Sequence, residues 1–299
     1  MNKNYKCGYV ALMGRPNVGK STLLNHLLGQ KLSITSRKPQ TTRHQILGIK
    51  TTENTQYIFV DTPGLHKGGR QALHRYLNRA AQSIIHDMDV IVFVVEALQW
   101  TEEDEIVLSY LKESQCPIVL AINKIDLVKE KEKLLPYLEM VSSKYNFASV
   151  LPIAANKNIQ LTELLEIVSN NLPDSEAHYP EDQITTRSSK FVAAEMIREK
   201  IIRSLGDELP YATTVEIEKY DETNKLLTIH AVIWVERDNQ KAIVIGKGGE
   251  RLKKIGTQAR KELETFFDKK VHLKTWVKVR QGWSDDERAL QQLGYIDEF

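Results

Sequence analysis

Strand-type and helix-type patterns of apolar residues alternate along the first half of the chain. Short apolar runs predict strands at 8–13, 45–51, 56–60, 89–95, 117–122 and 150–153. Apolar positions three and four residues apart predict helices at 21–28, 102–111 and 161–172. Strands and helices that alternate at these lengths predict an α/β fold, in which a mostly parallel sheet carries helices on both faces.

The second half follows a different order. A polar stretch with two prolines at 173–189 predicts a linker. Helical spacing at 190–205, 240–245 and 250–267, with alternating strands at 213–220, 226–236 and 271–279, gives the order α-β-β-α-α-β. The first of these helices has an apolar stripe at Phe191, Ala194, Ile197, Ile201 and Leu205. We therefore predict one domain at 1–172, a linker at 173–189 and a second, α+β domain at 190–299.

A phosphate-binding loop stands between the first predicted strand and helix. The motif G-x-x-x-x-G-K-[ST] is matched in full by Gly14, Arg15, Pro16, Asn17, Val18, Gly19, Lys20 and Ser21. Its backbone N–H groups and the helix N-terminus favour an anion. We expect Lys20 to reach the β- and γ-phosphates of a nucleotide and Ser21 to bind Mg²⁺. The alternative is a chance glycine-rich turn, which the flanking strand and helix disfavour.

Two further segments predict the rest of a nucleotide switch. In the polar loop at 29–44, a threonine hydroxyl is expected to complete the Mg²⁺ coordination, with Thr42 preferred over Thr41. A plain polar loop is the alternative. At the end of a predicted strand, Asp61, Thr62, Pro63 and Gly64 form D-x-x-G. Asp61 is expected to hold the metal through water, and the Gly64 N–H to contact the γ-phosphate. Lys20, Thr42 and Gly64 are thus the predicted catalytic groups.

The residues after Gly64 leave the placement of the attacking water open. Leu65 stands where Ras-type GTPases have a water-orienting glutamine, so hydrolysis is expected to be slow or to use another device. His66 is interpreted as an exposed loop residue before it is interpreted as a general base.

A third motif predicts the base. Asn123, Lys124 and Asp126 form N-K-x-D at the end of a predicted strand. The carboxylate of Asp126 can accept both N1–H and the exocyclic amine of guanine, a pair of donors that adenine lacks. At the end of the last strand, Ala154 stands at a usual serine position, and the backbone N–H of Ala155 is expected to meet the guanine oxygen.

Composition and the distribution of charge predict a cellular location and a second class of ligand, a polyanion. The net charge of +2 conceals an acidic stretch at 173–240 and a basic one at 241–280, with 12 Lys and Arg against 4 Asp and Glu. A basic block of that density predicts either a solvated face or a polyanion site. The chain shows neither a secretory segment nor an apolar run of membrane-spanning length. Cys7 and Cys116 are expected to be reduced thiols of a cytosolic protein.

The basic block surrounds a G-x-x-G turn. The α-β-β-α-α-β order with this turn is typical of a type II KH domain, whose loop clamps a nucleic-acid backbone. The alternative is a helix–turn–helix corner with solvated lysines. Trp276, Trp283 and Tyr295 are interpreted as core and tail-docking residues before base-stacking ones, and Ser284 as the N-cap of a final helix. The predicted RNA-binding residues are Gly246, Lys247, Gly248, Gly249, Arg251, Lys253 and Lys254.

With these motifs in order, the chain resembles the Era family of GTPases from end to end. The segments that carry the resemblance are the phosphate loop, residues 38–43, the D-x-x-G and N-K-x-D motifs, residues 244–249 and the tail at residues 281–288. The resemblance implies binding of the 3′ end of 16S ribosomal RNA and a role in assembly of the 30S subunit. It implies a cytoplasmic protein with peripheral association at the inner face of the cell membrane. It also places Asn17 where related switches bind K⁺. Ala154 and Pro39 depart from the family pattern.

Three function classes follow from the sequence. The preferred one is a GTP-hydrolysing, RNA-binding assembly factor that acts as a monomer. The second is an RNA chaperone whose nucleotide domain is a sensor with negligible turnover. The third, a membrane-surface switch, is disfavoured because no basic amphipathic helix with an aromatic face stands out.

Overall fold

The chain folds into two compact units. The computed structural model describes residues 5–36, 38, 41–64, 72–73, 77, 84–205, 212–293 and 295. The first unit comprises Met1–Ser33, Thr42–Gly69 and Arg75–Thr186, and the second comprises Ile34–Thr41, Arg70–His74 and Arg187–Phe299. In the described part of the chain, no helix has the length and apolar character needed to cross a bilayer.

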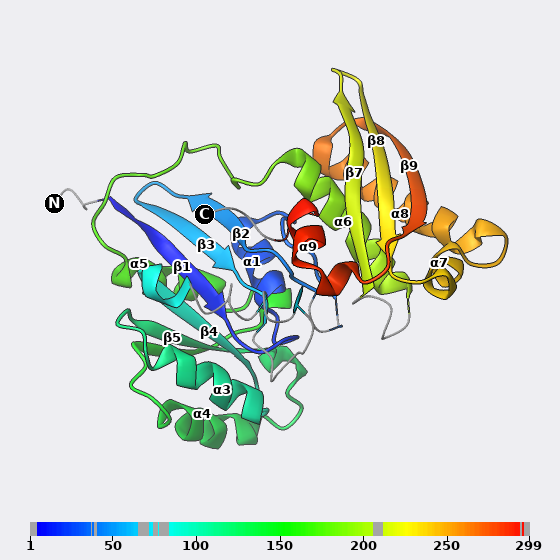
Figure 1. Cartoon of the computed structure of the whole chain (residues 1–299). Helices are drawn as coiled ribbons and strands as arrows, with labels where there is room; N and C mark the ends of the chain where they lie inside the picture. The colour runs from blue at the N-terminus through cyan, green and yellow to red at the C-terminus, as the bar shows by residue number, and fades with distance from the viewer. Residues whose placement is uncertain are drawn as a thin grey trace. The chain divides into compact units, whose positions relative to one another are not determined.

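The first unit is built on a six-stranded sheet (Figure 1). The strands are β1 (Lys6–Met13), β2 (Ile46–Thr51), β3 (Thr55–Asp61), β4 (Val90–Glu96), β5 (Ile118–Asn123) and β6 (Ser149–Pro152), in the order β2-β3-β1-β4-β5-β6. Only the β2–β3 pair is antiparallel. The strands of the parallel pairs are apolar runs because helices bury both of their faces. The predicted α/β fold is confirmed.

In the part of the first unit that the structure describes, four α-helices accompany the sheet. They are α1 (Lys20–Leu28), α3 (Glu102–Leu111), α4 (Leu134–Ser142) and α5 (Leu161–Asn171). One apolar cluster joins β1, β3, β4 and β5 to α3 and α4, through residues such as Val107 and Val141. The sequence analysis did not identify α4, whose third residue is Pro136. Proline is tolerated there because the first turn of a helix has no partner for its N–H groups.

Much of the predicted linker is bonded to the first unit. The side-chain oxygen of Gln56 in β3 accepts hydrogen bonds from the backbone of His178 and Tyr179, at 2.8 and 3.0 Å. Further along, the Ile49 N–H donates to the carbonyl of Ile184 at 2.7 Å. Residues 174–185 therefore follow the edge of the sheet rather than forming a free tether.

The second unit has the predicted order α-β-β-α-α-β. Its elements are α6 (Ser189–Ser204), β7 (Thr213–Glu222), β8 (Leu226–Val235), α7 (Asp238–Ile245), α8 (Glu250–Phe267) and β9 (Lys270–Val279). β7 and β8 form an antiparallel hairpin, whereas β8 and β9 are parallel because the α7–α8 crossover joins them. The α6 helix packs against α8 and β7.

The α6 helix is buried more widely than its predicted stripe. Phe191 and Ala194 are only half-buried, while Val192 and Met196 are in the core. Four charged residues of α6 are also buried: Glu195, Arg198, Glu199 and Lys200. These residues pair partly with one another, as Glu195 does with Arg198, and partly with the segment Ile34–Thr41 of the same unit, where Thr35 N–H donates to Glu199 at 3.0 Å. Buried charges of this kind require such partners.

Two aromatic residues near the end of the described chain pack into the second unit. Trp283 and Tyr295 are both fully buried, with ring centroids 6.0 Å apart, which confirms that they are core residues. Trp276 is 41% exposed, so the same interpretation was wrong for it. Ser284 is buried and donates to Glu236 at 2.5 Å. The predicted N-cap was also wrong, because Asp286 caps α9 (Glu287–Gln292) instead.

Candidate functional site

The predicted nucleotide motifs meet at one edge of the first sheet. The phosphate loop follows β1, the D-x-x-G segment begins at the last residue of β3, and the N-K-x-D segment begins at the last residue of β5. These three strands run parallel and lie near one another in the sheet. Ligands of open α/β sheets bind outside the carboxyl ends of the strands. The topology therefore brings together motifs that lie about a hundred residues apart in the sequence.

The phosphate loop has a backbone that demands glycine. Gly19 has a φ of 106°, which L side chains rarely adopt. A Cβ atom there would lie 2.4 Å from Nδ2 of Asn123. At Gly14, a Cβ atom would lie 2.4 Å from the carbonyl oxygen of Val94. Both glycines of the motif are thus required by close packing, in addition to any approach by a ligand.

Lys20 is folded over the loop. Its Nζ donates to the carbonyls of Gly14 and Arg15, at 2.8 and 2.9 Å. Burial lowers the pKa of Lys20 to about 8, an effect that the nearby carboxylate of Asp61 opposes. Burial disfavours the charged ammonium group, and a negative charge close to it favours that form. The loop therefore presents a cation whose charged form a phosphate would stabilise.

Three hydroxyl side chains converge on Asp61. Oδ2 of Asp61 accepts from Ser21 at 2.8 Å and from Ser33 at 2.7 Å. Thr42 Oγ1 lies 2.8 Å from Ser21 Oγ. Oδ1 of Asp61 is buried without a hydrogen-bond partner in the described part of the chain, and burial raises the pKa of this carboxyl group. Hydroxyl and carboxylate oxygens are the ligands that Mg²⁺ prefers, so these residues fit a magnesium ion.

Thr41 and Thr42 differ in what their hydroxyls do. Thr41 Oγ1 donates to the carbonyl of Lys38 at 2.6 Å, so it is engaged within its own loop. Thr42 Oγ1 lies beside Ser21. The structure therefore favours Thr42 as the candidate metal ligand, although its role stays a prediction. The sequence analysis missed Ser33, because no motif marks a serine at that spacing.

The D-x-x-G segment lies against the phosphate loop. Thr62 Oγ1 donates to the carbonyl of Leu12 at 3.0 Å, and Pro63 is buried. A Cβ atom on Gly64 would lie 2.9 Å from the backbone nitrogen of Pro16. Gly64 is therefore next to the loop that would hold phosphate. Leu65 and His66 lie outside the described residues.

Asn123 joins three loops of the site. Its Nδ2 donates to the carbonyl of Val18 at 2.8 Å, and its Oδ1 accepts from the N–H of Ala155 at 3.0 Å. The Ala155 N–H, which the sequence analysis assigned to the guanine oxygen, is thus already used by Asn123. Ala154 is fully buried. The contribution of these two alanines to base recognition stays a prediction.

The base-recognition segment is held at Lys124 and open at Asp126. Lys124 has a φ of 67°, and its Nζ lies 2.7 Å from a carboxylate oxygen of Glu96. Asp126 is exposed and has no hydrogen-bond or ion-pair partner among the residues that the structure describes. An open carboxylate beside a fixed loop is the arrangement that recognition of two N–H donors requires.

Arg15 is anchored by carboxylates that sequence reasoning missed. It lies 3.1 Å from Asp104 and 3.5 Å from Glu96. Glu96 is the last residue of β4 and Asp104 belongs to the capping box of α3, and only the second has a local sequence signal. Asn17, with a φ of 65°, is exposed at the tip of the loop.

The G-x-x-G turn of the second unit also has the backbone of a glycine clamp. Gly246, Gly248 and Gly249 have φ values of 74°, 59° and 81°. A Cβ atom on Gly248 or Gly249 would meet no heavy atom within 4 Å, so the backbone there is open. Arg251 donates to the Ile243 carbonyl at 2.6 Å. Beside the turn stand the exposed cations Lys247, Lys253 and Lys254.

Comparison with known proteins decides the family. The family described as 50S ribosome-binding GTPase matches residues 9–124, and the KH domain family matches residues 208–284. A protein from Ectopseudomonas mendocina, GTPase Era, is 58% identical over 98% of each chain. GTPase Era from Pseudomonas aeruginosa is 58% identical over 98% of this chain and 96% of its own. This chain belongs to the Era family of GTPases.

Solved structures of Era agree with the architecture. One, Era in complex with MgGDPNP and nucleotides 1506–1542 of 16S ribosomal RNA, has a TM-score of 0.94 and 38% identity, and covers 97% of this chain and 99% of its own. A variant of Aquifex aeolicus Era bound to GDP and AlF₄⁻ has a TM-score of 0.93 at the same identity and coverage. The predicted P-loop GTPase domain followed by a KH domain is confirmed.

The contact between Gly19 and Asn123 gives a testable prediction. We expect Gly19→Ala to lower GDP and GTP affinity by about tenfold to a hundredfold, because backbone strain of about 1–3 kcal/mol adds to displacement of Asn123. Titration with a fluorescent guanine nucleotide measures this. Gly29→Ala is the matched control, since Gly29 also has a positive φ, of 74°, but a Cβ atom there would meet nothing within 4 Å. Equal losses in both variants would contradict the prediction.

Proposed function

We propose that this Era-family GTPase grips GTP at the carboxyl edge of its first sheet and holds ribosomal RNA at the glycine turn of its second unit. The observation that supports the first half is the convergence of Lys20, the Asp61 hydroxyl cluster and Asp126 at that edge. A cation for phosphate, oxygen ligands for a metal and an open carboxylate for the base are what a guanosine triphosphate requires.

The phosphate end carries the chemistry. In this proposal Ser21, Thr42 and Asp61 hold Mg²⁺, which supplies Lewis-acid stabilisation of phosphate charge when it is bound. Lys20, the Gly64 N–H and the backbone N–H groups of the phosphate loop, which Pro16 lacks, stabilise charge that develops on the transferring phosphoryl group. The backbone groups among them are already oriented, so they need little reorganisation during the reaction. In this proposal Lys20 exchanges its hydrogen bonds to the Gly14 and Arg15 carbonyls for contacts with the phosphates.

The attacking water needs a different device from that of Ras. Because the residue after Gly64 is Leu65, its side chain can neither donate to nor accept from a water molecule. We propose that backbone groups and a K⁺ ion place the water, with Asn17 as a K⁺ ligand. In support of this, Asn17 is exposed at the tip of the phosphate loop.

The second unit would bind the partner, a ribosomal RNA. We propose that Gly246–Gly249 and the cations at 247, 251, 253 and 254 clamp the 3′ segment of 16S ribosomal RNA, and that the protein acts as a monomer in 30S assembly. The solved Era complex contains nucleotides 1506–1542 of that RNA, which supports this proposal. A cytoplasmic location with peripheral association at the cell membrane completes the proposal, on the family resemblance alone.

Base recognition is tested by Asp126→Asn. We expect GTP affinity to fall about a hundredfold or more, because two hydrogen bonds to a carboxylate are lost, and affinity for xanthosine triphosphate to rise. Competition between the two nucleotides for wild type and variant measures the exchange. Glu130→Gln, at an exposed carboxylate four residues along the chain, should leave the preference unchanged. If Asp126→Asn kept its selectivity for guanine, the role of Asp126 in base recognition would be contradicted.

Potassium dependence is tested at Asn17. We expect GTP turnover to be faster in potassium than in sodium buffer, and Asn17→Gly to abolish that difference. Glycine is the suitable replacement because it accepts the φ of 65° and removes only the side chain. Phosphate release measures turnover, and nucleotide titration checks that binding persists. Equal rates in both buffers would exclude the K⁺ ligand, and negligible turnover in every condition would favour a sensor without catalysis.

The clamp is tested by a pair of variants at Gly248. Both Asp and Asn tolerate a φ of 59°, and a Cβ atom at Gly248 would meet no heavy atom within 4 Å. Gly248→Asp should weaken RNA binding at least about tenfold through repulsion of the phosphates, whereas Gly248→Asn of nearly equal shape should weaken it much less. GTP affinity should be unchanged in both. Filter binding of the 16S segment gives the comparison, and identical affinities in the two variants would count against a backbone clamp.

A further inference from the structure

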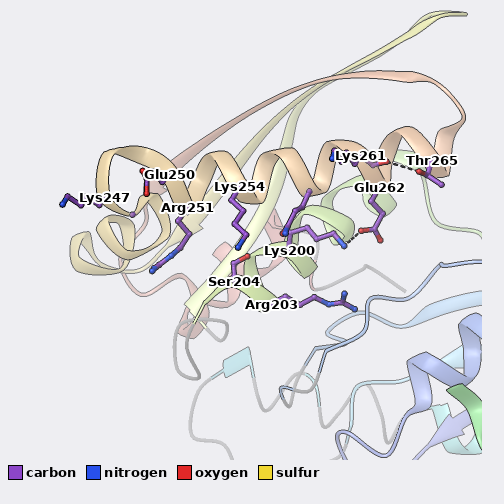
Figure 2. A pocket seen from close by; sticks show the side chains of 12 residues that line it. Lys200, Arg203, Ser204, Lys247, Glu250, Arg251, Lys254, Lys261, Glu262 and Thr265 are labelled. Carbon is purple, nitrogen blue, oxygen red and sulfur yellow. Dashed lines mark hydrogen bonds and ion pairs between the residues drawn. The ribbon is translucent and has the colours of Figure 1, made fainter.

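A groove on the second unit lies between α6 and α8 and ends at the glycine turn. It has a volume of about 1000 Å³, and Figure 2 shows the side chains around it. Six cations line it: Lys200 and Arg203 from α6, Lys247 from the turn, and Arg251, Lys254 and Lys261 from α8. Two acids, Glu250 and Glu262, also line it, so cations dominate.

The groove residues of α8 form one face of that helix. Arg251, Lys254, Gln258 and Lys261 are separated by three, four and three residues, the spacing at which helical side chains stand above one another. The buried residues Ile255, Ala259 and Leu263 face the core from another side. Arg251 and Lys261 are ten residues apart, which is about 15 Å along a helix. The charged row is therefore much longer than one phosphate group.

Most of this positive charge is not neutralised within the protein. Glu262 is paired with Lys200 across the groove. In the described part of the chain, Lys247, Lys254 and Lys261 have no ion-pair partner. Like charges repeated along one helix face repel one another. An anion that follows the row would remove this repulsion.

We propose that the α6–α8 groove is a second RNA-backbone site, which holds the phosphates of the strand that continues past the glycine turn. The proposal rests on the proposed RNA clamp at Gly246–Gly249 and extends it to residues of α6 and to Lys261. The lining contains cations and small polar groups but no aromatic side chain on which a base could stack. The groove would therefore add affinity without reading sequence.

Lys261→Glu tests the groove: Lys261 is exposed and has no ion-pair partner among the described residues, so its replacement should not disturb the fold. Lys274→Glu is the matched control: Lys274 is equally an exposed lysine of the second unit, but it does not line the groove. The probes are the 16S segment 1506–1542 and a series truncated from either end to about four nucleotides, the length that a KH clamp holds. Fluorescence anisotropy at several salt concentrations gives each affinity.

We expect Lys261→Glu to weaken binding of the long RNA by about tenfold and to reduce its salt slope by about 0.7 for each lost phosphate contact. Binding of the shortest RNA that wild type retains should be unchanged, as should GTP affinity. The groove is excluded if Lys261→Glu binds long RNA like wild type, if it loses short and long RNA equally, or if Lys274→Glu has the same effect. If wild-type protein binds none of the RNAs, the proposed clamp fails as well, and the groove with it.

Discussion

The structure of the first unit depends on one requirement: a chain of phosphates must meet positive charge and N–H groups that are already in place. Water solvates a triphosphate well, so a site competes best if its donors need little rearrangement. The parallel sheet meets this requirement by ending β1, β3 and β5 at the same edge. Asn123 then fixes the phosphate loop to the base-recognition loops through the Val18 carbonyl and the Ala155 N–H.

Charge burial in the nucleotide site is the consequence of that design. Lys20 and Asp61 are both buried. Burial lowers the pKa of Lys20 and raises the pKa of Asp61, so it favours the neutral form of each side chain. Such groups destabilise a fold unless other charges or hydrogen bonds compensate. Lys20 is compensated by loop carbonyls and Asp61 by serine hydroxyls, but Oδ1 of Asp61 lacks a partner among the described residues. The site is therefore built for a ligand that brings both negative charge and a cation.

The sequence predicted local features well and distant partners poorly. The phosphate loop and α8 were found because their signals lie within one short segment, and α8 has the predicted bounds of 250–267. Ser33 and Glu96 were missed because their roles depend on Asp61 and Lys124, which are distant in sequence. Ser284 looked like a helix cap, but Glu236, 48 residues away, takes its hydroxyl. Tertiary contacts thus overrode local preferences where a polar side chain was buried.

The α6 helix was predicted from the sequence, but the burial of its charged residues was not, and their contacts explain why. Arg198 is paired with Glu195 and also donates to the carbonyl of Thr41, the residue just before Thr42. Arg203 donates to the carbonyl of Thr35 and also lines the α6–α8 groove. One helix therefore bonds the segment that leads to a candidate metal ligand and lines a surface suited to polyanions. Polar contacts regain water when they open, so they are easier to exchange than apolar packing. An anion that draws on Arg203 would therefore alter the bonds of Thr35 within the second unit.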